Sequence, residues 1–256
     1  LHLKGKSLRG EKLTARLGQS PVTLKARVAD LSAPRLELDL QAPAVRADEL
    51  SFFHSDRTVL RDLNGHLTLD RDSLWFAPVK VRLDGGTNAT ITGSVKNFSD
   101  PLVELDISGE HANVKEIIGL WTDESPTAAT ARKARHSADP NKKHPHIRIN
   151  VDARSGDLYG MKFTDATALI VPTAEMLLIH PLDFRVGEGA CTSQVVVDYS
   201  GPHSLLRVSG HVEDIDAYQI YNELLHRKSI LRGSLRGDFY LQGELGGTGF
   251  LPTSYG

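Results

Sequence analysis

Short segments in which apolar and polar residues alternate fill most of this 256-residue chain. Residues 36–40 read Leu-Glu-Leu-Asp-Leu, and residues 103–107 read Val-Glu-Leu-Asp-Ile. Alternation with a period of two is typical of a β-strand that has one apolar face and one polar face. We count about fifteen such segments, so the sequence predicts a mainly β protein.

The connections between these segments are short. Asp84-Gly85-Gly86 is a strong hairpin signal, and the sequence Asn-Phe-Ser-Asp-Pro at 97–101 is another turn. A parallel crossover needs about a dozen residues or more, so the sequence predicts an antiparallel sheet. We expect strands at residues 1–4, 12–17, 22–29, 35–40, 60–69, 73–76, 79–83, 89–96, 102–108, 147–153, 162–171, 174–180, 182–186, 192–199, 205–209, 229–235 and 238–243.

Three strands lead into short helical segments. We expect helices over 45–53, over 114–120 with Asn113 as N-cap, and over 215–225 with Asp214 as N-cap. An offset of 101 residues relates Leu105 to Leu206, Gly109 to Gly210 and Asn113 to Asp214, and one of 103 relates Pro78 to Pro181 and Gly86 to Gly189. Such recurrence predicts a repeating architecture.

Residues 122–146 interrupt the alternation. They are rich in Ala, Ser, Thr and Pro and carry a basic cluster of Arg132, Lys133, Arg135, Lys142 and Lys143. This composition predicts a flexible insertion, either merely solvated or in contact with lipid headgroups or another acidic partner. The sequence therefore predicts one elongated repeat domain over 1–256, with approximate units at 1–58, 59–121, 147–227 and 228–256.

Several classes of function have little support in the sequence. The net charge of −2 gives no electrostatic attraction to nucleic acid. The eleven histidines are scattered without a metal-binding spacing, and Cys191 is the only cysteine. No nucleophile, carboxylate pair or glycine-rich loop has the setting that catalysis requires. We therefore expect neither an enzyme nor a bound cofactor or metal, and we expect Cys191 to serve in packing.

The apolar faces outnumber the elements that can cover them. About fifteen one-sided strands and three short helices leave apolar surface that needs a second sheet, other protein or a non-protein ligand as partner. A long sheet that keeps adding strands and curls along its length fits the repeat better than a sandwich. The predicted fold is a long, curled antiparallel sheet that forms a hydrophobic groove, with about three short helices. An ordinary paired-sheet binding module remains open.

Residues 231–243 (LRGSLRGDFYLQG) and 249–256 (GFLPTSYG), with the strand–glycine–helix unit before them, resemble the C-terminal region of AsmA-like proteins. That family includes the TamB-type and YhdP-type envelope proteins of Gram-negative bacteria. The resemblance implies a β-groove protein of the periplasm, anchored in the inner membrane outside this chain, that moves phospholipid toward the outer membrane. Because the chain starts within an alternating segment and not at Met, we expect it to be a fragment.

The leading hypothesis is that acyl chains lie along the apolar face of the sheet. The candidate lining residues are Leu36, Leu38, Leu40, Val79, Val81, Leu83, Ile91, Val103, Leu105, Ile107, Leu182, Phe184, Val186, Val195, Val197, Leu206 and Val208. Expected partners are phospholipids and membrane proteins of the inner and outer membranes. The alternative is a periplasmic scaffold that assists outer-membrane protein assembly by strand addition at a sheet edge.

Overall fold

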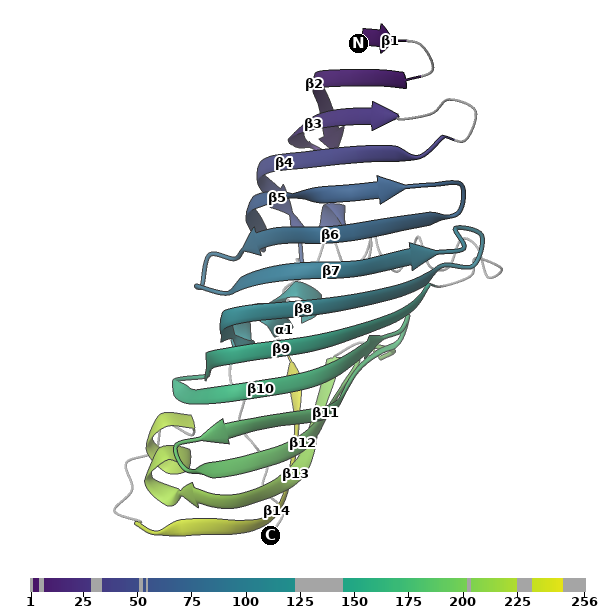
Figure 1. The fold of residues 1–256 in the computed structure, drawn as a ribbon. Helices are drawn as coiled ribbons and strands as arrows, with labels where there is room; N and C mark the ends of the chain where they lie inside the picture. Colours follow the sequence, from purple (N-terminus) through teal and green to yellow (C-terminus); the bar gives the residue numbers. More distant parts are fainter. Residues whose placement is uncertain are drawn as a thin grey trace. The chain divides into compact units, whose positions relative to one another are not determined.

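The computed structural model of the protein describes residues 2–4, 7–28, 34–50, 53, 55–122, 145–201, 204–224 and 232–245. These residues form a mainly β structure with fourteen strands in one sheet (Figure 1). The strand order follows the chain from β1 to β14, and the pairings from β1 to β7 and from β9 to β14 are antiparallel. The antiparallel, mainly β prediction is therefore confirmed.

Two compact units make up the chain. The first unit comprises Leu1–Ile107 and Gly119–Ile147, and the second comprises Ser108–Ile118 and Arg148–Gly256. The strands are β1 (His2–Lys4), β2 (Ser7–Leu17), β3 (Ser20–Val28), β4 (Leu36–Arg46), β5 (Val59–Leu69), β6 (Ser73–Arg82), β7 (Asn88–Lys96), β8 (Leu102–Asn113), β9 (His146–Leu158), β10 (Met161–Pro172), β11 (Met176–Val186), β12 (Gly189–Asp198), β13 (Ser204–Asp216) and β14 (Ser234–Leu245).

Three short helical elements interrupt the strands: the 3-10 turn η1 (Ala47–Glu49), the α-helix α1 (Val114–Thr122) and the π-helix η2 (Gln219–Leu224). The helix expected over 45–53 is wrong, because β4 continues to Arg46 and the described residues that follow it form one 3-10 turn, Ala47–Glu49. The alternating Leu-Glu-Leu-Asp-Leu run extends its strand pairing through Val45, which pairs with Leu60. Most of the insertion expected at 122–146, and residues 225–231, lie outside the described residues.

The two predicted N-caps have different outcomes. Asn113 caps α1 as expected, because its Oδ1 accepts a hydrogen bond from the Glu116 N–H at 3.2 Å. Asp214 is wrong as a cap, since it lies within β13 with φ +56°. Asp216 takes that role, because its Oδ1 accepts the Tyr218 N–H at 2.9 Å. The capping residues of the two helices are therefore 103 positions apart.

β-bulges explain why several expected strands are longer than alternation alone predicted. The strands expected at 73–76 and 79–83 form the single strand β6 up to Arg82, and those expected at 174–180 and 182–186 form β11 from Met176 onward. The register of β6 shifts between Phe76 and Val79, and that of β11 between Ile179 and Leu182. Pro78 and Pro181 lie at these shifts, where the missing N–H removes no ladder hydrogen bond. Of the strands expected at 229–235 and 238–243, β14 contains residues 234–235 and all of 238–243, whereas residues 229–231 lie outside the described residues.

Three aspartates with positive φ occupy comparable bulges. Asp62, Asp165 and Asp214 have φ values of +52°, +52° and +56°, and the register shifts at each of them. Aspartate is one of the few residues with a side chain that tolerates this conformation. Because Asp62 and Asp165 are 103 residues apart, the repeat is visible in the backbone of β5 and β10.

One expected glycine match is wrong. Gly86 has φ +99° in the β6–β7 turn, but Gly187, with φ +60°, lies in the β11–β12 turn. Gly189 begins β12, where an added Cβ would lie 2.5 Å from the Asp214 carbonyl oxygen. Close backbone approach, and not turn formation, therefore requires glycine at position 189.

Candidate functional site

Aliphatic side chains of the first unit stand in rows that cross its strands. Residues directly opposite each other in a ladder share one face of a sheet, so the register defines these rows. Row A contains Leu8, Val28, Leu36, Leu69, Leu74 and Val95, and row B contains Gly10, Ala26, Leu38, Leu67, Phe76 and Gly93. Row C contains Leu13, Leu24, Leu40 and Gly65. The rows form a continuous apolar face over β2–β7.

Rows A and B are only partly covered. Leu36, Leu38, Leu67 and Phe76 are all half-buried, as is every other side chain larger than glycine in these two rows. A core of this composition would normally bury such residues almost completely. This part of the apolar face is therefore accessible to solvent.

The same face is covered at the opposite ends of the strands. Val45 and Ala47 are completely buried, and Leu60 and Val79 are each 5% exposed. The segment after β4 is tied to its surroundings by backbone hydrogen bonds, from Ala47 N–H to the Thr58 carbonyl and from Asp48 N–H to the Ser55 carbonyl. We call this side of the first unit the η1 edge.

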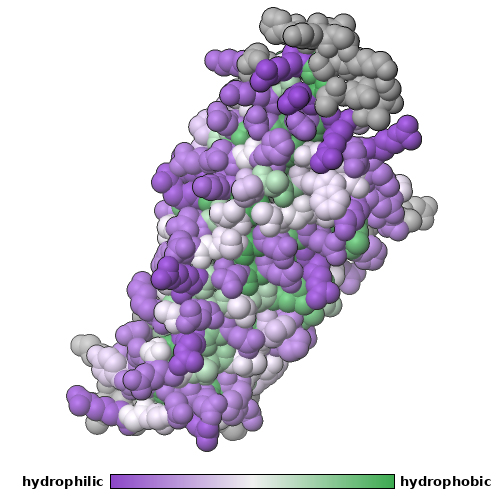
Figure 2. Space-filling view, in the orientation of Figure 1, coloured by the Kyte–Doolittle hydropathy of each residue, from purple (hydrophilic) through white to green (hydrophobic). Residues whose placement is uncertain are grey.

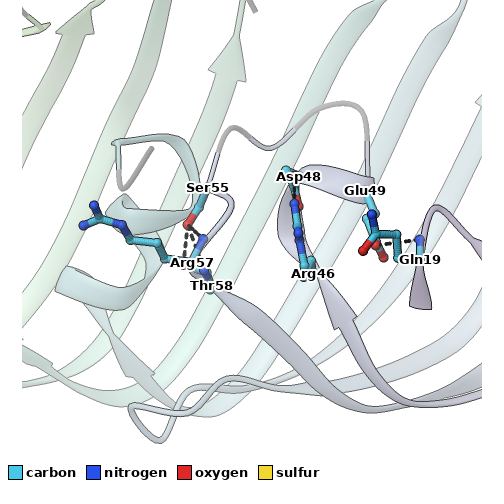
Figure 3. A network of polar contacts seen from close by, with 7 residues as sticks. All are labelled: Gln19, Arg46, Asp48, Glu49, Ser55, Arg57 and Thr58. Carbon is cyan, nitrogen blue, oxygen red and sulfur yellow. Dashed lines mark hydrogen bonds and ion pairs between the residues drawn. The ribbon is translucent and has the colours of Figure 1, made fainter. Parts of the chain in front are cut away.

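Ser55 holds the η1 edge together (Figure 3). It is completely buried, and its Oγ accepts the Thr58 N–H at 2.9 Å and donates to Thr58 Oγ1 at 2.8 Å. Its own N–H donates to the carbonyl of Leu120 at 3.0 Å. The serine therefore joins η1, the start of β5 and the end of α1, and its hydroxyl is used for structure.

Charged side chains complete this edge. Arg46 forms an ion pair with Asp48, and Glu49 Oε1 accepts the Gln19 N–H at 2.8 Å (Figure 3). Burial opposes the charged form of Glu49, but hydrogen bonds from Ser20 and Gln19 outweigh it and lower its pKa. Glu49 thus anchors η1 to the β2–β3 turn as a carboxylate.

The reverse face of the first unit carries Trp75 among polar side chains. The face seen in Figure 2 is mainly hydrophilic. Trp75 is 43% exposed and stands between its cross-strand neighbours Thr68 and Ser94, which are buried. The Lys96 ammonium lies 5.5 Å from the Trp75 ring centre and 3.1 Å from Glu104. The indole therefore shields two small polar residues and leaves the apolar rows on the other side.

The second unit has equivalent rows, but most of their members are buried, and only Val208 and the β14 residues Leu241 and Gly243 are half-buried. Row D contains Pro172, Leu177, Val197, Leu206 and Gly243, and row E contains Ile149, Ile170, Ile179, Val195, Val208 and Leu241. Leu177 and Val197 are completely buried, and Ile149 is 2% exposed. Figure 1 shows strands β10–β14 curving strongly within this unit. A sheet that curls toward its apolar face buries that face, which accounts for the contrast with rows A and B.

Helices cover the other end of this face. Met161, Phe163, Val186, Cys191 and Ile215 belong to one buried cluster. Val114 and Ile117 of α1 and Ile220 of η2 pack against that cluster. The helices therefore cover part of the sheet in the second unit and leave no free apolar face in this cluster.

Neither a cluster of metal ligands nor a reactive thiol is found among the described residues. Nowhere in the described ranges do three or more His, Cys, Asp or Glu residues gather as metal ligands do. Cys191 is 3% exposed, and its burial raises the pKa of the thiol to about 11. A thiol held in its protonated form by an apolar cluster is suited to packing, as expected. Within the described residues, no helix is both long and apolar enough to span a membrane.

The predicted lining residues all lie on the apolar side of their strands but differ in exposure. Half-buried members are Leu36, Leu38, Leu40, Ile91, Val103, Ile107, Leu182, Phe184 and Val208, and buried members are Val79, Val81, Leu83, Leu105, Val186, Val195, Val197 and Leu206. The second group is engaged in packing within the protein itself. A lipid-lining role remains a prediction for the first group.

Leu67, Leu69, Leu74, Phe76 and Val95 also belong to rows A and B but were absent from the predicted lining, as were Leu8, Ala26 and Val28. The first five stand in alternating segments, so period-two counting over 59–69, 73–76 and 88–96 would have found them. Comparisons of the chain with family models, with curated proteins and with solved structures gave no match.

Proposed function

We propose that this protein carries phospholipid between the membranes of a Gram-negative envelope, with acyl chains lying against the apolar face of the first unit inside a β-groove. The observation that carries this proposal is the half-burial of rows A and B. Their aliphatic side chains follow one another across β2–β7 in register. The resemblance to AsmA-like proteins supports a place in the periplasm with an inner-membrane anchor.

The energetics favour a long, weakly selective contact. Moving one methylene group out of water contributes about 0.8 kcal/mol, so an acyl chain gains enough from many equivalent Leu and Val contacts to be held. The rows contain no charged group that would create a deep local minimum. A chain that exchanges one aliphatic neighbour for the next can therefore slide across the strands.

Mass spectrometry of protein purified from a Gram-negative periplasm tests the proposal. Wild-type protein should retain phospholipid. Leu38→Asp places a carboxylate in the middle of row B and should reduce retained lipid about fivefold or more, because burying that charge against an acyl chain is costly. Leu38 is half-buried, so the variant should still fold.

Thr14→Asp is the matched control. Thr14 lies on the exposed, opposite side of β2 and pairs with Thr23, so it gains the same charge away from the rows. Its lipid content should equal that of the wild type. Wild-type protein free of phospholipid, or equal lipid loss in both variants, would contradict the proposal.

A second function is favoured by β14. Within the described ranges this twelve-residue strand pairs only with β13, so its outer edge offers backbone groups for strand addition. A scaffold for outer-membrane protein assembly would use that edge. Site-specific crosslinking from Tyr240, which is 59% exposed, should then capture unfolded barrel strands and no lipid.

A further inference from the structure

The open rows of the first unit end at a charged turn. Row A lies next to the connections at 70–72 and 97–100, on the side opposite the η1 edge, at the right-hand ends of β5–β8 in Figure 1. Leu69 is followed at once by Asp70, Arg71 and Asp72, and Leu36 is preceded by Arg35. We call residues 35, 70–72 and 97–100 the Arg71 edge.

Backbone hydrogen bonds hold the two carboxylates of this edge in place. Asp70 Oδ1 accepts the N–H groups of Asp72 and Ser73 at 3.2 and 3.0 Å. Asp72 Oδ1 accepts the Phe98 N–H at 3.1 Å, which joins the β5–β6 turn to the β7–β8 turn. Each carboxylate is thus fixed through one oxygen, and both residues are exposed.

The exposed Arg71 stands between these carboxylates, and the exposed Arg35 lies at the start of β4. Leu36 pairs with Leu69, so Arg35 and Asp70, which flank this pair, lie at the same end of β4 and β5, and Arg71 follows in the turn. The headgroup of a lipid whose acyl chains occupy rows A and B would leave the sheet at this end. Guanidinium groups bind phosphate through paired N–H donors. The two carboxylates provide the complementary charge for an ammonium group.

We propose that the Arg71 edge binds the headgroup of a zwitterionic phospholipid, with Arg35 and Arg71 on its phosphate and Asp70 and Asp72 on its ammonium group. This inference rests on the proposed lipid-carrying function and adds a headgroup preference to it. An anionic headgroup that lacks an ammonium group leaves the two carboxylates without a cationic partner and is therefore bound less well. The η1 edge lacks this arrangement, because its Arg46 is already paired with Asp48 and its apolar rows are buried.

Native mass spectrometry tests this preference. The full chain is incubated with vesicles that contain equal amounts of phosphatidylethanolamine and phosphatidylglycerol with identical acyl chains. Retained lipid should favour phosphatidylethanolamine about threefold to fivefold, the size of one to two exposed charge interactions. The double variant Asp70→Asn, Asp72→Asn keeps amide oxygens that can accept the turn hydrogen bonds, and its preference should shift toward phosphatidylglycerol.

The control is Asp62→Asn with Asp84→Asn, which removes the same charge at the opposite ends of β5 and β6. Those carboxylates pair with Arg82 and Arg61, and the control should keep the wild-type preference. Lipid retained in the input ratio, unchanged by Asp70→Asn with Asp72→Asn, would overturn the headgroup inference and leave the proposed function standing. Wild-type protein that retains neither lipid would overturn both.

Discussion

Leu38 in the first unit and Val197 in the second each stand in the middle of an aliphatic row that crosses several strands. Leu38 is half-buried, whereas Val197 is completely buried. The strand patterns that produce the two rows are the same, so the difference comes from what lies over them. In the second unit, strand curvature and the helices α1 and η2 cover the face. In the first, η1 and Ser55 cover only one edge.

This contrast separates two uses of one sequence pattern. In the second unit the apolar rows form a core and contribute to stability. In the first unit rows A and B are only half-buried and contribute less to stability. Substitutions at matched positions in the two units should therefore differ in kind as well as in size.

The largest difference should appear on truncation to alanine. Leu177→Ala in row D should lower the free energy of unfolding by about 3 kcal/mol, because it leaves a cavity in a fully buried site. Leu38→Ala in row B should cost about 1 kcal/mol or less, since its side chain already contacts water. Urea unfolding followed by circular dichroism measures both. Equal losses would remove the distinction between the units.

Cys191 reports on the cluster of the second unit. Its pKa is about 11, compared with 9.0 for an ordinary thiol, so the thiolate fraction at pH 8 is about a hundredfold smaller. Burial also hinders the approach of an alkylating reagent to Cys191. Iodoacetamide should modify it only after unfolding. Leu177→Ala should accelerate the modification and Leu38→Ala should leave it slow. Rapid labelling of the native wild type would show that the cluster is open.

Helix capping should have a moderate effect. Asp216→Ala removes the acceptor for the Tyr218 N–H and should cost about 1 kcal/mol. Asp214→Gly should be neutral within a few tenths of a kcal/mol, because glycine accepts the positive φ at that bulge without strain. Thermal unfolding of the two variants compares them. A larger loss for Asp214→Gly would restore Asp214 as the structurally important aspartate.

The smallest effect should come from Glu49 at the η1 edge. Its folded-state pKa lies below the ordinary value of 4.5, so its contribution to stability is present above pH 4.5 and is lost as the pH falls through the lower, folded-state pKa. The difference in Tm between wild type and Glu49→Gln should therefore be greatest near neutral pH and vanish in acid. A Tm difference that grows as the pH falls would contradict this prediction.

Alternation sufficed to predict the antiparallel sheet, the strands around Leu36–Arg46 and Leu102–Asn113, and the cap at Asn113. It failed where the backbone departs from regular geometry. Pro78 and Pro181 looked like strand ends because a proline usually interrupts a ladder, and the bulges that accommodate them depend on the neighbouring strand. Aspartate is a common N-cap residue, but Asp214 lies in a bulge of β13. That bulge depends on the pairing of β13 with β14.

The alternating pattern also does not predict how far the apolar face is exposed. Leu38 and Val197 lie in similar alternating segments, and only strand curvature and helix placement distinguish them. Such coverage arises between residues far apart in the chain, so a local period does not encode it. The sequence therefore predicts which side chains form the apolar face of each strand, but it does not predict which part of that face is only half-buried.

Because each strand pairs with its immediate predecessor, a strand of the described sheet can pair before any later strand has been made, although residues 114–145 separate β8 from β9. Contacts between neighbours in sequence carry a small loop-closure cost and form early. A chain emerging from a ribosome or a secretion channel could add one hairpin after another to the growing edge. The strand order thus permits vectorial folding, in which assembly keeps pace with delivery of the polypeptide.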